Sequence, residues 1–217
     1  ADSARGHDST TAANRNTPMT GVSNVARRFE GYPDYATVAP HSDFSSPSFS
    51  FSTWIRLDES LDKWGVVFST YDGISAGWYL ALSADRRPIL SVSGTPGSSP
   101  WVLASQSLTL GRWQHLAVTF EGRERRGIIY IDGVRSASAV FPAWTPSTGI
   151  SPHFGRASWS NGAYVRYFLD DPTLYGHELT GAEVVARHAL HSSRQTPQPL
   201  ARWEFESTAG DGTMADS

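Results

Sequence analysis

The sequence predicts an all-β fold, and three observations support this class. Short blocks rich in β-branched and aromatic residues recur along the chain, and Gly, Pro, Asp or Ser bounds each block. Several blocks alternate between apolar and polar residues, as half-buried strands do. The composition, 39% hydrophobic with 19 Gly and 13 Pro, supplies both a core and many turns. Because all-β sandwiches of 217 residues commonly form one unit, we expect a single domain over residues 1–217.

The expected strands follow a polar opening segment, residues 1–24, which has no useful period and predicts loop. They are residues 49–57, 65–69, 77–82, 88–92, 113–120, 127–131, 164–169 and 173–175. Asp132 and Gly133 predict a tight hairpin that leads into a strand from Val134. Pro172 is expected to end its ladder, because proline has no N–H to donate.

One short accessory helix is predicted from Gly181 to about residue 190. Thr180 can cap its first turn, and Glu183 stands three residues later, as a capping box requires. Val184, Val185 and His188 are expected to share one side of this helix.

Charge excludes some classes of partner. The formal net charge is -3, and the 18 basic residues are spread along the chain, so we expect neither a nucleic-acid nor an anionic-membrane partner. No apolar run is long enough for a membrane span, and the absence of cysteine excludes disulfides and thiolate metal sites. The first residues lack the apolar stretch of a signal peptide, so we expect a mature or excised piece.

Five blocks in a fixed order carry a family resemblance. They are FSTWIRL at 51–57, GRWQHLAVTF at 111–120, IYIDGV at 129–134, LDDPTLY at 169–175 and LTGAE at 179–183. In this order they resemble the signature strands of laminin-G-like, concanavalin A-like jelly-roll domains. The resemblance implies an antiparallel β-sandwich of two packed sheets.

The two ends of the chain resemble the same sequence position in two successive repeats of a tandem array. Members of this family usually open with a strand of the form found here at residues 200–206, LARWEFE, and the chain both begins and ends with Ala-Asp-Ser. Residues 191–199 have the composition of a linker. We expect residues 200–217 to complete the sheet, either by folding back in cis or by pairing with another copy.

Calcium is the cofactor that the resemblance implies, because this fold often holds one with loop carboxylates and carbonyls. Asp170 and Asp171 match the family's Asp-Asp pair, and Asp2 matches its Asp-Ser loop, whereas His7 departs from the family's small residue. Adjacent strand residues face opposite ways, so Asp170 is favoured over Asp171 as the ligand. The alternative is that these aspartates cap turns without a metal.

Tryptophans in loops form the predicted ligand surface. Three tryptophans in strand patterns are expected in the core: Trp54, Trp113 and Trp203. The others lie in or beside Gly/Pro/Ser-rich loops, where rings can stack on a sugar face: Trp64, Trp78, Trp101, Trp144 and Trp159. Asp72, Arg156 and Asn161 are expected to bond sugar hydroxyls beside them. The alternative for each ring is that it pins a loop onto the sandwich.

Catalysis has little support in the sequence. Glu204 and Glu206 share a strand face, as the paired carboxylates of glycosidases on related jelly rolls do, but any half-buried strand shows this alternation. The histidines occur singly, and no serine has the context of a nucleophile elbow. We expect a protein that is not an enzyme.

The function expected from these observations is non-catalytic carbohydrate binding, with calcium assistance, in a larger secreted or cell-surface protein. The expected partners are a glycan or polysaccharide, neighbouring domains of the parent protein, and other copies through end strands. A structural or protein-interaction module in a tandem array is the alternative, and a glycan-cleaving enzyme is the third hypothesis.

Overall fold

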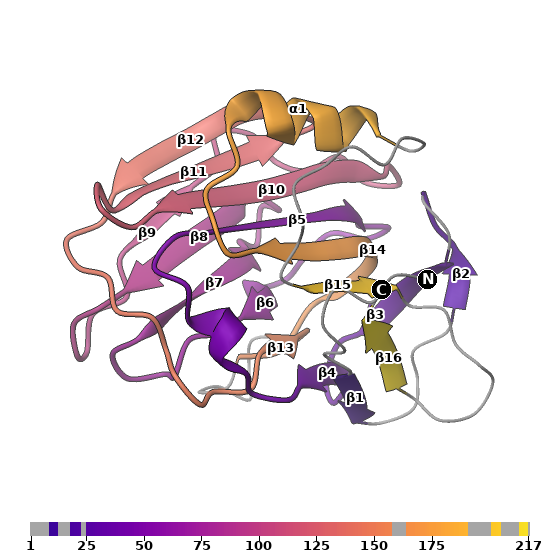
Figure 1. Cartoon of the computed structure of the whole chain (residues 1–217). Helices are drawn as coiled ribbons and strands as arrows, with labels where there is room; N and C mark the ends of the chain where they lie inside the picture. The colour runs from indigo at the N-terminus through magenta and orange to yellow at the C-terminus, as the bar shows by residue number, and fades with distance from the viewer. Residues whose placement is uncertain are drawn as a thin grey trace.

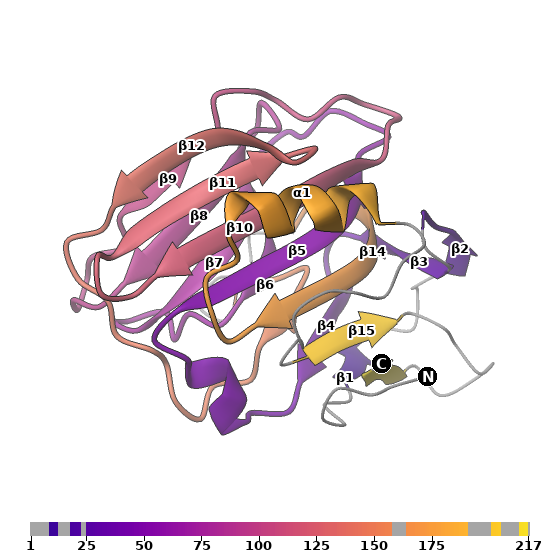
Figure 2. The same cartoon turned by 45° about the horizontal axis from the view of Figure 1, so that its top comes forward.

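Two antiparallel sheets and one α-helix make up the part of the chain that the computed structural model describes: residues 9–12, 18–22, 25–157, 164–190, 201–204 and 213–216 (Figures 1 and 2). This architecture confirms the predicted all-β sandwich. Among these residues no helix has the length and hydropathy that a membrane crossing requires.

The sheet that we call the back sheet, which is the nearer of the two in Figure 1, has the strand order β12-β11-β10-β5-β14-β3-β2, and all neighbouring strands in it are antiparallel. Its strands are β2 (Pro18–Thr20), β3 (Val25–Glu30), β5 (Phe49–Arg56), β10 (Gln114–Glu121), β11 (Arg126–Ile131), β12 (Val134–Val140) and β14 (Arg166–Tyr175). Asp132 and Gly133 turn β11 into β12, as predicted, and both adopt the positive φ that such a hairpin needs.

The front sheet has the order β1-β4-β13-β6-β7-β8-β9. Its strands are β1 (Ser9–Ala12), β4 (Tyr35–Val38), β6 (Gly65–Ser69), β7 (Gly77–Leu82), β8 (Pro88–Ser93), β9 (Trp101–Leu103) and β13 (His153–Phe154). One turn of 3-10 helix, η1 (Ser42–Ser45), lies in the connection from β4 of this sheet to β5 of the back sheet.

Two further strands join the sheets near the chain ends. β15 (Ala201–Glu204) pairs antiparallel with β14, β16 (Thr213–Asp216) pairs with β15, and β1 pairs with β16. Part of the predicted segment 200–217 therefore lies beside β14 of its own chain. Pairing with another copy stays a prediction, as does the role of residues 191–199, which lie outside the described residues.

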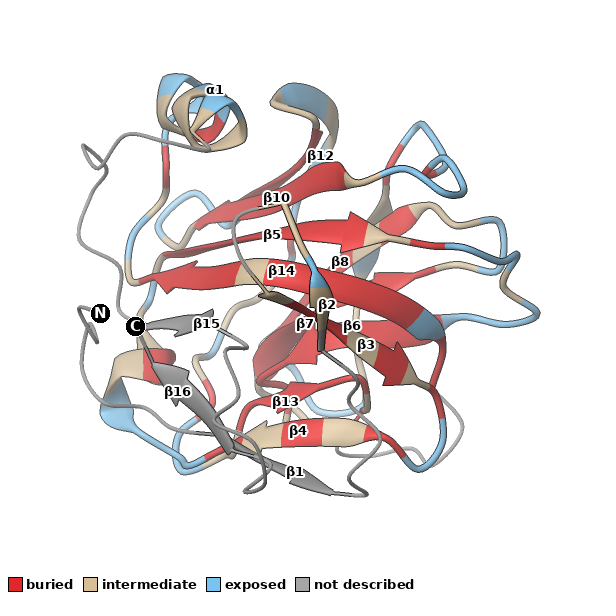
Figure 3. Ribbon diagram, turned by 90° about the vertical axis from the view of Figure 1, so that its right-hand side faces the viewer, coloured by how far each residue is buried: buried red, intermediate tan, exposed pale blue. Residues whose placement is uncertain are grey.

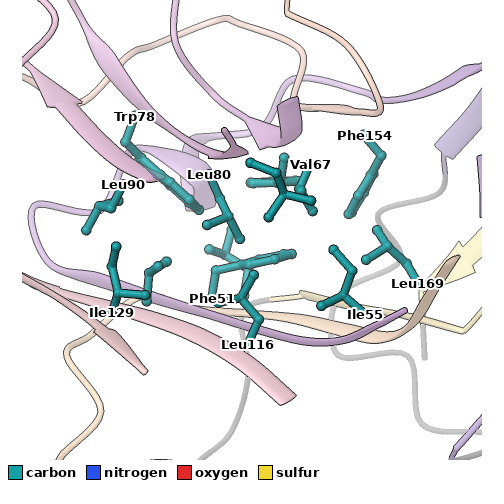
Figure 4. Close-up of a cluster of buried hydrophobic side chains, with 14 of the residues drawn as sticks. Phe51, Ile55, Val67, Trp78, Leu80, Leu90, Leu116, Ile129, Phe154 and Leu169 are labelled. Carbon is teal, nitrogen blue, oxygen red and sulfur yellow. The ribbon is translucent and has the colours of Figure 1, made fainter. Parts of the chain in front are cut away.

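The core fills the space between the two sheets. Phe49 of the back sheet stacks on Trp78 of the front sheet with ring centroids 4.3 Å apart, and Phe51 stacks on Phe68 at 4.7 Å. Figure 4 shows Trp78 pointing into this space together with Leu80 and other apolar side chains from both sheets. Burial of these apolar surfaces supplies the main stabilisation of the sandwich.

The predicted helix is α1 (Gly181–Ala189), which covers the outer face of the back sheet (Figures 1 and 3). Thr180 and Glu183 form the expected capping box. Val184 is fully buried against this sheet, but Val185 is 51% exposed, so the expectation that these two share one side of the helix is wrong.

Pro172 interrupts the ladder of its strand, as predicted, and residues 173–175 resume it. β14 runs through it to Tyr175, with a register shift against β5 between Asp170 and Thr173. A bulge of this kind accommodates a residue that cannot donate to the ladder. β3 pairs with β14 before this irregularity, and β15 pairs with it afterwards.

Candidate binding site

Six side chains project to the outer side of the front sheet in one cross-strand row, but His153, Ser69, Tyr79 and Ser91 among them are buried, and Tyr71 and Ala157 form an apolar cluster with Tyr79. Directly paired residues on six neighbouring strands make up this row, in the order Thr37, His153, Ser69, Tyr79, Ser91 and Trp101. Paired residues of an antiparallel ladder project on the same face, so these six lie on the outer side of the sheet. Because side chains alternate along a strand, the neighbours of Tyr79, which are Trp78 and Leu80, point into the core.

An aromatic pocket of about 230 Å³ lies on this side of the sheet, lined by Trp64, Tyr79, Ile89 and Trp101. The Trp64 ring lies 6.4 Å from the Tyr79 ring, and Trp64 and Trp101 are 40% and 60% exposed. Exposed rings that border a concave site are suited to contact with the apolar face of a ligand. We refer to these four residues as the aromatic pocket.

Two loops at one end of the front sheet are held by internal hydrogen bonds. In the loop after β6, the Asp72 carboxylate accepts the N–H groups of Ile74, Ser75 and Ala76. These bonds outweigh the effect of burial and lower the pKa of the Asp72 carboxyl. Asp72 thus orders its own loop. Its role in bonding sugar hydroxyls stays a prediction.

The loop between β8 and β9 is anchored to the sheet beneath it. The Ser91 and Ser93 hydroxyls donate to the carbonyl oxygens of Pro100 and Ser98. Gly97 N–H also donates to Ile74 O at 3.0 Å, so the two loops brace each other. These bonds fix the path of the loop that leads into Trp101 at the start of β9.

Only part of the predicted tryptophan surface comes together. Trp64 and Trp101 meet in the aromatic pocket, but Trp78 is 2% exposed in the core, so its expected position on the ligand surface is wrong. Trp144 packs on Phe120 at 5.2 Å and donates its Nε1–H to Pro47 O, which is the alternative role of pinning a loop. Trp159 and Asn161 lie outside the described residues.

The tryptophans expected in the core behave differently from one another. Trp54 is 8% exposed beneath α1, beside His115 and His188. Trp113 is only partly buried, with the Arg56 guanidinium 5.7 Å from its ring, so a core position is wrong for this residue. The side chain of Trp203 lies outside the described residues.

Arg156 lies at the other end of the outer face, near β4 and β13. Its guanidinium carbon is 4.4 Å from the centre of the Tyr35 ring, and that ring is 6.3 Å from the His153 ring. Burial, and to a smaller extent the positive charge of Arg156, lower the pKa of His153 to about 4. His153 is therefore a neutral base near neutral pH.

The two described aspartates of the predicted calcium site face different partners. The Asp170 carboxylate, in a residue that is 3% exposed, accepts the Val22 N–H at 2.5 Å. The Asp171 carboxylate accepts from Arg187 at 3.0 Å. Among the described residues no three His, Asp or Glu side chains converge on a point that could hold a metal ion. Asp2 lies outside these residues, so the described donors do not by themselves form a calcium site, and calcium stays a prediction.

Catalytic carboxylates are not placed by the structure. The side chain of Glu204, in β15, and the whole of Glu206 lie outside the described residues. The hypothesis of a glycan-cleaving enzyme therefore gains no geometric support.

Sequence reasoning missed Tyr79, Ile89 and His153 as residues on the outer side of the front sheet. All three lie in strands that are buried on nearly every position, so the alternation of polar and apolar residues does not distinguish the two faces. The signal that separates them is the pairing of neighbouring strands, which a single sequence does not provide.

A comparison with protein-family models matches residues 30–185 to the family described as the concanavalin A-like lectin/glucanases superfamily. The chain belongs to this superfamily. The match confirms the resemblance noted in the sequence and spans most of both sheets.

The superfamily assignment agrees with the relatives found. The bovine (Bos taurus) pentraxin-related protein PTX3 is 26% identical over 153 residues, which are 69% of this chain and 38% of that protein. The chain thus spans well under half of that relative's length.

Solved structures share the fold at low sequence identity. A native heptameric SAP-like pentraxin from Limulus polyphemus has a TM-score of 0.58 at 17% identity, covering 100% of this chain and 97% of that one. The binding domain of Paraclostridial Mosquitocidal Protein 1 has a TM-score of 0.66 at 16% identity, covering 81% and 45%. A structure of botulinum neurotoxin type C, a toxin whose cell entry depends on interaction with two ganglioside molecules, has a TM-score of 0.66 at 14% identity, covering 87% and 47%.

Proposed function

We propose that this domain is a non-catalytic, carbohydrate-binding module of a secreted or cell-surface protein, and that the aromatic pocket is its sugar site. The observation that carries the proposal is the pair of exposed rings, Trp64 and Trp101, which border one pocket on a sheet face. A solvent-exposed indole gains little from folding, and a second indole that lines the same pocket favours a role in contact with a ligand.

The relatives support the class of function rather than a particular sugar. A pentraxin and toxin binding domains share this fold, and one of them is described as interacting with gangliosides. The pentraxin-related relative favours placement outside the cell. Because one fold hosts many ligands, the ligand itself is assigned from the pocket.

The first test is a glycan-array screen of the purified domain with added calcium and again with a chelator. We expect binding to sugars with an exposed apolar face. Binding that is lost with the chelator would support calcium assistance, and binding that survives would exclude it. Silence in both conditions would refute the sugar-binding proposal and favour an interaction module.

Variants then locate the site. Trp101→Ala should weaken binding of the best array ligand at least about 10-fold, because a stacked ring at the centre of a contact carries much of its energy. Trp101→Phe should retain part of the affinity. Trp113→Ala is the matched control, since this partly buried ring lies on the back sheet away from the pocket. Equal affinity of Trp101→Ala and the parent chain, measured by calorimetry, would move the site elsewhere.

A further inference from the structure

The strand residues at the aromatic pocket come from two adjacent rows of the front sheet. Trp101 of β9, Ser91 of β8 and Tyr79 of β7 are paired in one row. In the next row, Ile89 of β8 is paired with Ala81 of β7. Residues two apart on a strand project to the same side of the sheet, so all five lie on the outer side. Among these five residues, Ser91 carries the one aliphatic hydroxyl.

The polar side chains next to the pocket are bonded to the protein itself. Ser91 is 1% exposed, and its hydroxyl donates to Pro100 O at 2.8 Å. Arg87, just before β8, donates from Nε to Ala104 O at 2.7 Å and lies 3.8 Å from the Asp85 carboxylate. The described lining of the pocket contains no carboxylate, amine or amide side chain. Recognition in this pocket therefore depends on apolar contact.

The size of the pocket limits what can enter it. Sites for drug-sized ligands measure about 300–1,000 Å³. The aromatic pocket measures about 230 Å³, so it holds one sugar residue rather than a segment of a chain. Selectivity then follows from which group of that one residue enters the pocket.

The chemistry of the lining disfavours a sugar hydroxyl in this position. Indole N–H groups only donate, so Tyr79 carries the one side-chain acceptor in the described lining. A hydroxyl that leaves water without a partner costs roughly 10- to 100-fold in affinity. A methyl group in the same place is instead stabilised by burial against Ile89 and the rings.

We propose that the aromatic pocket selects sugars in which a methyl-bearing group replaces a hydroxyl. The methyl group contacts Ile89 and the rings of Trp64 and Trp101. This inference rests on the proposed sugar site and names the class of its ligand. Two kinds of sugar residue offer this chemistry: N-acetylhexosamines carry the methyl in the acetamido group, and 6-deoxyhexoses carry it on the ring.

Two matched pairs of sugars test the preference, as competitors of the best ligand from the glycan array. N,N′-diacetylchitobiose is compared with cellobiose, which has hydroxyls in place of the acetamido groups. L-fucose is compared with L-galactose, which differs by one hydroxyl. We expect the methyl-bearing sugar of at least one pair to compete at a concentration at least about 10-fold lower than its partner. The pair that shows the preference identifies the source of the methyl group.

Variants of Ile89 test where the methyl group binds. Ile89→Thr places a hydroxyl in the pocket and should bring the ratio within the pair close to one. Ile89→Val has the shape of threonine without the hydroxyl and should keep the preference. Val140→Thr introduces a threonine at a 68% exposed position of the back sheet, and this control should have no effect. Thermal unfolding of each variant verifies that it is folded.

The outcomes separate this inference from the proposed function. Equal competition within both pairs, with array binding that still depends on Trp101, would overturn the methyl selection while the sugar site stands. A preference that Ile89→Thr and Ile89→Val leave alike would also overturn it, because the methyl group would then bind elsewhere. Failure of every glycan on the array and of both pairs would refute the proposed function and, with it, this inference.

Discussion

Some tryptophans of this chain are buried in the core and others are exposed, and the extent of burial determines how much stability the chain loses when each is replaced. Trp78 is 2% exposed between the sheets, whereas Trp101 is 60% exposed at the pocket. We expect Trp78→Ala to lower the free energy of unfolding by about 3–5 kcal/mol, as removal of a large buried ring does. Trp101→Ala should change it by less than about 1 kcal/mol. Urea unfolding measures both, and a large loss in Trp101→Ala would contradict its assignment to the surface.

His153 makes stability depend on pH. Its pKa is about 4 in the folded chain, against 6.5 for an unperturbed histidine, so the unfolded state binds the proton more tightly. The contribution of the neutral His153 to the free energy of unfolding is therefore fully present above the pKa of the unfolded state. It is lost as the pH drops from about 6.5 towards about 4. After allowance for solvent screening, the loss should be on the order of 2 kcal/mol.

The measurement compares urea unfolding at about pH 7.5 and about pH 5, which bracket the unfolded pKa. His153→Gln should show a shallower decline than the parent chain. His41→Gln, at a half-exposed histidine, should keep the parent's decline. Identical declines in all three proteins would assign the pH dependence to other groups.

The positions of individual side chains could be predicted from the sequence only in part. Trp64 and Trp101 were predicted as ligand residues and do line one pocket, but Trp78 was assigned to the same surface. Trp78 follows Gly77 in an apolar strand, and both faces of that strand are covered, so no polar neighbour reveals its direction. Arg156 was predicted to bond ligand hydroxyls, whereas the absence of a carboxylate partner among described residues is visible only in three dimensions.

Elements were predicted more reliably than side-chain directions, because local chemistry determines them. The helix after Thr180 begins with the capping box expected from Thr180 and Glu183, and the Asp132-Gly133 hairpin forms as predicted. In β14 the ladder is interrupted at Asp171 and Pro172, as proline predicts, and pairing of Thr173 and Leu174 with β5 and β15 restores it. Such support from neighbouring strands depends on contacts distant in sequence.

The helix cap gives a prediction at this scale. Thr180→Ala removes the side-chain acceptor of the Glu183 N–H, so we expect a loss of about 1 kcal/mol in the free energy of unfolding. Thr180→Ser keeps the hydroxyl and should lie close to the parent. Chemical denaturation of the three proteins tests this, and equal stability of Thr180→Ala and Thr180→Ser would show that the cap contributes nothing.

At the scale of the whole molecule, the pairing of β15 with β14 of its own chain predicts a monomer. The pairs are Thr173 with Arg202 and Leu174 with Ala201, and they cover one edge of β14. Unpaired strand edges invite association, so this cover should suppress it. Sedimentation velocity over a range of concentrations should show one species. A concentration-dependent dimer that disappears when residues 200–217 are deleted would instead support exchange of this segment between copies.

The pleat of the front sheet has a further consequence. Trp78, Leu80 and Leu90 project inwards from the same strands that carry Tyr79 and Ile89 outwards. Replacement of the outward residues changes what the surface recognises and leaves the interior contacts in place. The domain is therefore suited to diversification: variants with new ligand preferences can be selected at the pocket positions of β7, β8 and β9 from one unchanged interior.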